Sequence, residues 1–139
     1  MISISFLMIQ DEMENKNMKM KLKDVVVLYN ELKQLLDNKN NELDIVVQFT
    51  LLGILKELDV PFQNYNSIKE NLAVKYGEDP DDEGVIKIKK EYMDKFYEES
   101  KKLLDSDVDL KIEKIPANKL FNVGIPSDIL LRLYDYIEM

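Results

Sequence analysis

Alternating apolar and charged positions predict two short strands, one toward each end of the chain. Residues 18–22 place methionine and leucine between lysines, and residues 108–112 place valine, leucine and isoleucine between charged side chains. A period of two is typical of a strand with one buried face, because successive side chains point to opposite sides. A shorter apolar run at 85–88 predicts a third strand.

Helical periodicity accounts for most of the remaining chain. After Asp24, apolar residues recur at three- and four-residue spacing, which predicts a helix with Asp24 as its N-cap. Residues 42–58 are apolar on nearly every side, and this is typical of a helix buried between neighbours. Gly53 lies inside this second helix, where we expect its missing side chain to permit close helix packing.

Proline and glycine mark the expected ends of further helices. Asp59-Val60-Pro61 predicts a break, because proline suits the first turn of a new helix and disrupts a helix interior. The next helix is expected over 62–76, with Gly77 just beyond its end. Two more are expected over 92–104 and from Pro126-Ser127 onward.

These elements follow the order β-α-α-α-β-α-β-α, which predicts a helix-dominated α+β fold. We expect about five helices and a small sheet of two or three strands. A length of 139 residues fits one domain, which we assign to residues 20–139. Residues 1–19 are expected to form an N-terminal extension that is either disordered or an added strand. No secretory signal and no membrane-spanning apolar run are predicted, so we expect no membrane partner and a cytoplasmic protein.

Composition then narrows the chemistry that the chain can perform. The sequence contains no Cys and no His, which excludes thiol nucleophiles, thiolate zinc sites and imidazole acid–base catalysis. The net charge is −8 and Arg132 is the single arginine, whereas phosphate binding requires clustered Lys and Arg. We therefore predict a protein that is not an enzyme, has no catalytic, metal or cofactor-binding residues, and does not bind nucleic acid directly.

One stretch, Asp79-Pro80-Asp81-Asp82-Glu83-Gly84, raises the question of a metal site. Asp79, Asp81 and Glu83 match the first three ligand positions of a calcium-binding EF-hand loop. Lys90 occupies the position of the bidentate glutamate that such a loop requires. An ammonium in that position argues against calcium binding.

The same stretch supports two other interpretations. Pro80-Asp81 and Asp109-Leu110-Lys111 supply the residue types of a Mg²⁺-dependent nuclease, although the second group equally fits the solvated face of a strand. A solvated turn explains every residue, since proline presets a dihedral angle and aspartates bond to their own backbone. Gly84 suits a conformation that other residues resist. We favour the turn.

Five segments carry a resemblance to a known family. They are MKLKDVVVLYNELKQLL (20–36), KYGEDPDDEGVIKI (75–88), DKFYEESKKLL (94–104), VDLKIEKI (108–115) and IPSDILLRLYDYIE (125–138). In their order and spacing they resemble a family of small proteins of unknown function from tailed bacteriophages and prophages of Gram-positive bacteria. The resemblance implies a product of the late genome region, between tail and lysis genes, and it brings no catalytic residues.

The leading hypothesis is a non-enzymatic phage protein that acts by protein–protein interaction, such as a virion or tail-assembly accessory factor. Its expected interaction surface comprises Val46, Phe49, Leu52 and Gly53, because residues 42–58 carry more apolar surface than a small sheet covers. The partner is expected to be a phage structural protein, a host protein or a second copy, in the host cytoplasm or the virion. One alternative is an acidic inhibitor of a host defence or nucleic-acid-binding protein. A remoter alternative is a Mg²⁺-dependent phosphoesterase.

Overall fold

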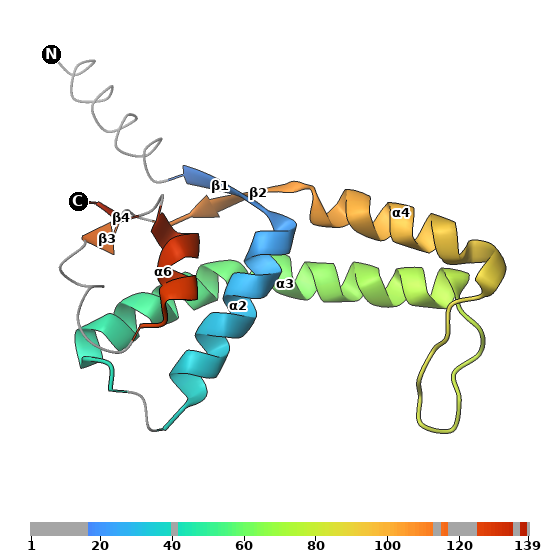
Figure 1. The fold of residues 1–139 in the computed structure, drawn as a ribbon, viewed down its shortest axis with the longest axis horizontal. Helices are drawn as coiled ribbons and strands as arrows, with labels where there is room; N and C mark the ends of the chain where they lie inside the picture. The colour runs from blue at the N-terminus through green and yellow to red at the C-terminus, as the bar shows by residue number, and fades with distance from the viewer. Residues whose placement is uncertain (1–16, 40–41, 113–114, 117–124, 135–136, 139) are drawn as a thin grey trace, which may run out of the picture.

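Helices dominate the computed structural model, which describes residues 17–39, 42–112, 115–116, 125–134 and 137–138. Figure 1 shows α3 running along the length of the molecule, with α2 crossing its first half and α4 lying beside its second half. The elements are β1 (Asn17–Lys21), α2 (Leu22–Asp37), α3 (Ile45–Tyr76), the short 3₁₀ helix η1 (Lys90–Tyr92), α4 (Met93–Leu104), β2 (Asp107–Lys111), β3 (Ile115–Pro116), α6 (Ser127–Leu133) and β4 (Ile137–Glu138).

The two strands that alternation predicts pair with each other as an antiparallel sheet. β1 and β2 place Met20 opposite Val108, and Lys19 opposite Asp109. Met20 and Leu110 are buried while Lys19 and Asp109 are exposed, so one face of the sheet covers the core. A second sheet consists of the two-residue strands β3 and β4, which pair in parallel.

The core lies between α2, the first half of α3, α6 and the inner face of the sheet. α2 places buried residues at three- and four-residue spacing, as the periodicity predicts. The largest fully buried side chains are Leu28, Leu32, Leu51, Leu58, Leu110, Leu133, Val25 and Val47.

The expected break at Asp59-Val60-Pro61 is wrong, because α3 continues through it as one helix of 32 residues. Contacts with α2 support the helix on both sides of Pro61. The Tyr29 hydroxyl donates a hydrogen bond to Asp59 Oδ1 at 3.2 Å, and the Tyr29 ring stacks on Phe62 with centroids 3.8 Å apart. The described residues therefore contain four α-helices instead of the expected five, because the helices expected on either side of the break are the single helix α3.

Two further expectations about the elements need correction. Asp24 is not an N-cap, because α2 already begins at Leu22, and its side chain pairs with Arg132 instead. The strand expected at 85–88 is absent from the described residues, where a single bridge joins Ile88 to Gly77. By contrast, α4 and α6 confirm the helices predicted over 92–104 and after Pro126-Ser127.

The N-terminal extension is described only in part. Residues 17–19 belong to β1, the strand predicted over 18–22, while residues 1–16 lie outside the described residues, so the expected disorder or added strand stays a prediction. The helix-dominated α+β fold with a two-stranded antiparallel sheet is otherwise as predicted.

Candidate interaction surface

The first half of α3 has two apolar faces, and only one of them faces the core. Val47, Leu51, Ile54 and Leu58 are buried on the inner face. The opposite face carries five large apolar side chains that remain exposed, so the expectation of burial on all sides is wrong. Their exposed fractions are 77% for Ile45, 50% for Val46, 78% for Phe49, 42% for Leu52 and 64% for Val60.

Gly53 lies in the middle of this exposed face. A Cβ built there meets no atom within 4 Å, so the expected role in close packing within the fold is wrong. We call Ile45, Val46, Phe49, Leu52, Gly53 and Val60 the outer strip of α3. The strip contains all four residues predicted from the sequence and adds Ile45 and Val60.

Sequence reasoning missed Ile45 and Val60 for different reasons. Ile45 lies in the first turn of α3, where the apolar pattern does not distinguish an outer from an inner face. Val60 was assigned to the break before Pro61. Extending the 3.6-residue period through the proline places Val60 on the same face as Phe49 and Gly53.

The acidic loop is a self-contained turn. Asp81 Oδ1 accepts hydrogen bonds from the backbone amides of Glu83 and Val85, each at 2.9 Å, and Gly84 has φ +80°. The Glu78 amide donates to the Lys87 carbonyl at 2.8 Å, which closes the loop. These contacts agree with the turn interpretation.

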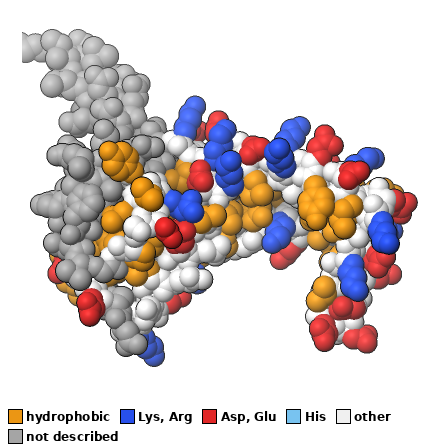
Figure 2. Space-filling view, in the orientation of Figure 1, with side chains coloured by type: hydrophobic (Ala, Val, Ile, Leu, Met, Phe, Trp, Pro, Cys, Tyr) orange, Lys and Arg blue, Asp and Glu red, His pale blue; other side chains and the backbone are white. Residues whose placement is uncertain are grey.

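Carboxylates on the loop point into solvent. Figure 2 shows acidic side chains gathered at the loop tip, and residues 78–83 are all exposed. Among the described residues, no three His, Cys, Asp or Glu side chains are arranged to hold a metal ion. The Asp81 carboxylate, which the calcium interpretation requires as a ligand, binds backbone amides instead.

The two halves of the nuclease-like pattern lie apart. Pro80-Asp81 is in the loop before α4, and Asp109 and Lys111 are on β2 after it (Figure 1). The 12 residues of α4 correspond to a rise of roughly 18 Å between them. Asp109 is exposed and faces Lys19 across the sheet, as expected for the solvated face of a strand.

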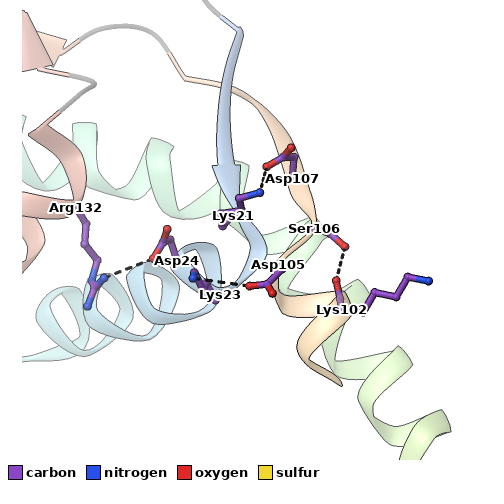
Figure 3. A network of polar contacts seen from close by, with 8 residues as sticks. All are labelled: Lys21, Lys23, Asp24, Lys102, Asp105, Ser106, Asp107 and Arg132. Carbon is purple, nitrogen blue, oxygen red and sulfur yellow. Dashed lines mark hydrogen bonds and ion pairs between the residues drawn. The ribbon is translucent and has the colours of Figure 1, made fainter. Parts of the chain in front are cut away.

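Ion pairs join α6 to α2 and β2 to β1, and Figure 3 shows the pairs Arg132–Asp24 and Lys21–Asp107 among them. Arg132 Nε lies 3.2 Å from Glu31 Oε1, and its NH1 atom lies 3.8 Å from Asp24 Oδ1. Lys21 Nζ lies 2.9 Å from Asp107 Oδ1. Their hydrogen bond raises the pKa of Lys21 and lowers the pKa of Asp107.

A shallow depression of about 540 Å³ lies over this network. Its charged lining consists of three cations and three carboxylates, which are Lys19, Lys21, Arg132, Asp24, Asp107 and Asp128. Opposite charges in equal number give no preference for an anionic or a cationic ligand. The network therefore serves to join elements that are distant in sequence.

Comparisons with protein-family models, with curated proteins and with solved structures found no match to this chain. No helix among the described residues is long and apolar enough to cross a membrane.

Proposed function

We propose that this protein acts by binding another protein chain through the outer strip of α3, without catalysing a reaction. One observation carries the proposal: five large apolar side chains on one face of a helix are between 42% and 78% exposed. Single exposed apolar residues are ordinary, whereas a contiguous patch of them is typical of an interaction site.

The inventory of side chains supports a binding role. The chain has no imidazole and no thiol, which are the groups most suited to proton transfer and nucleophilic attack near neutral pH. The acidic loop satisfies its own backbone, and the Arg132 network joins structural elements. By contrast, no side chain of the outer strip belongs to the buried core of the described residues.

A role as a phage or prophage accessory factor in virion or tail assembly extends this proposal. It rests on the five segments that resemble the phage family. Mass spectrometry of purified virions, together with the genes that flank this one, tests that extension separately from the binding surface.

A photo-crosslinking amino acid tests the binding surface directly. Benzoylphenylalanine in place of Phe49 keeps an aromatic side chain on the strip, and illumination of the cells that make the protein would join it to any chain within contact distance. The matched control is the same amino acid at Ser67, an exposed polar residue of the same helix. We expect crosslinked protein from position 49 and not from position 67. Equal or absent crosslinking at both positions would refute the proposal.

The exposed acidic loop favours a second candidate, an acidic inhibitor that covers a basic nucleic-acid-binding groove. Asp79→Asn, Asp82→Asn and Glu83→Gln remove charge and leave Asp81 to hold the turn. We expect the native chain, but not this variant, to release a nucleic-acid-binding host protein from immobilised DNA. No release by the native chain would contradict this candidate.

A further inference from the structure

The outer strip is self-complementary, and we infer that its partner is a second copy of this chain. In this arrangement two α3 helices pack antiparallel about a two-fold axis that passes between Leu52 and Gly53. The inference rests on the proposed function and adds to it the identity and orientation of the partner.

Antiparallel packing about this axis brings unlike positions of the strip together. Ile45 and Val60 are equally far from the axis, so Ile45 of one copy lies level with Val60 of the other. Leu52 likewise lies level with Gly53. A two-fold axis repeats each contact twice, which is the geometry of an isologous interface.

Gly53 gives the second copy a place for a large side chain. Glycine weakens a helix interior relative to alanine, and no neighbour within the described fold requires its small size. The open space above Gly53 can receive Leu52 of the second copy. Its position in the middle of an exposed apolar face is thus explained by contact from outside the chain.

Charges along the helix agree with the same register. Between Asp44 and Gln63, each charged residue lies level with an uncharged one. The pairs are Asp44 with Pro61, Lys56 with Phe49, Glu57 with Gln48, and Asp59 with Val46. Lys56, an exposed lysine between Leu52 and Val60 on the same face, reaches the Phe49 ring of the second copy, where a lysine is favourably placed. No like charges oppose each other.

The size of the strip suits a short, bounded interface. Its 16 positions span roughly 24 Å of helix. Five side chains of this size, between 42% and 78% exposed, present on the order of 600 Å² of apolar surface, at the upper end for a single patch on a monomer. From Gln63 to Asn71 the same face is polar, with Gln63, Asn64, Ser67 and Asn71 exposed, and its next exposed apolar side chain is Val74. The polar continuation ends the seam after about four turns.

Sedimentation of the full chain over a range of concentrations measures the association. We expect a dimer whose dissociation constant rises at least tenfold in Phe49→Glu, because the new carboxylate is buried against apolar side chains. Gly53→Gln should weaken the dimer by a similar factor while leaving the monomer folded, since open space surrounds that position. Ser67→Glu, on the polar continuation of the same face, should leave association unchanged.

Engineered cysteines test the orientation, because the native chain has none. Ile45→Cys and Val60→Cys, made as separate proteins and mixed under mild oxidation, should form a disulfide between unlike chains. Val60→Cys alone should remain unlinked, since the two copies of residue 60 lie at opposite ends of an antiparallel seam. Crosslinking of Val60→Cys to itself would overturn the antiparallel arrangement.

The outcomes separate this inference from the proposed function. A purified chain that stays monomeric at every concentration, while position 49 crosslinks to a different protein in cells, would overturn the dimer and keep the binding surface. A monomer in which position 49 crosslinks to residues 1–16 of its own chain would overturn both, because the strip would then be covered internally. A dimer that Phe49→Glu leaves intact would place the interface elsewhere and also overturn the inference.

Discussion

Replacing Pro61 by alanine distinguishes a continuous α3 from two helices that meet at the proline. In a continuous helix, the amide of residue 61 would donate to the carbonyl of Glu57, and proline removes that donor. Proline in a helix interior is about 3 kcal/mol less favourable than alanine. Pro61→Ala should therefore increase the free energy of unfolding.

The magnitude follows from the surroundings of Pro61. The side chain is only half-buried, and Tyr29 holds the helix on both sides of it through Asp59 and Phe62. Because these contacts have already adapted to the proline, part of the cost is not recovered, and we expect a gain of about 1–3 kcal/mol. For a chain of this length, such a gain raises the melting temperature by about 4 °C per kcal/mol.

A broken helix predicts the opposite sign. If Pro61 began a new helix, its missing N–H would cost nothing and its fixed dihedral would favour the folded chain. Alanine would then lower the free energy of unfolding by about 0.4–1 kcal/mol, because the unfolded chain gains freedom.

Urea unfolding followed by far-ultraviolet circular dichroism measures the difference. Both proteins should carry Phe49→Glu, so that self-association does not contribute to stability. Asn64→Ala is the matched control, since residue 64 is exposed and helical in either arrangement, and it should add no more than about 0.7 kcal/mol. A Pro61→Ala protein that is less stable than its parent would refute the continuous helix.

Three further changes test the core, the sheet and the loop. Leu58→Ala truncates a fully buried side chain of α3 and should cost about 2–5 kcal/mol in urea unfolding; a cost below about 1 kcal/mol would contradict its burial. Lys21 lowers the pKa of Asp107 from its ordinary value of 3.8. The pair therefore stabilises the fold fully above pH 3.8, and this stabilisation is lost as the pH falls through the lowered pKa of Asp107. Asp107→Asn should therefore flatten the decline of the urea midpoint in acid, and an unchanged decline would exclude the pair as a contributor. Gly77→Ala places a Cβ against the Ala73 carbonyl and the Ile86 side chain and should lower the stability of the loop by about 1–3 kcal/mol. Amide hydrogen exchange in the loop should become faster, and unchanged exchange would refute the collision.

Sequence patterns predicted the elements that the local spacing of apolar and polar residues specifies. The strands β1 and β2 follow from strict alternation, because the same pattern that buries Met20 and Leu110 exposes the charged side chains between them. α2 and α4 follow from helical spacing. The run at 85–88 is also strand-like, but its only described partner is a single bridge to Gly77, and a strand requires a continuous neighbour.

Contacts between distant residues account for what the sequence did not predict. Tyr29 and Asp59 are 30 positions apart, and their hydrogen bond helps to override the local preference of Pro61 for a helix start. Arg132 and Glu31 are 101 positions apart, so no local pattern indicates that they pair. For the outer strip, apolar character was visible in the sequence, but which face the core would cover depended on where α2 lies.

The energetics of α3 explain why binding and folding can be tested separately on one helix. Gly53 and Pro61 together disfavour the helix by about 4 kcal/mol relative to alanine. Burial of Val47, Leu51, Ile54 and Leu58 on the inner face contributes roughly 1.5–3 kcal/mol per side chain, which exceeds that cost. Burial on the inner face therefore outweighs the helix penalties of Gly53 and Pro61 without a contribution from the outer face. Substitutions at Phe49 and Gly53 change only surface that the described core does not use, so a change in association at those positions reports on contact between chains.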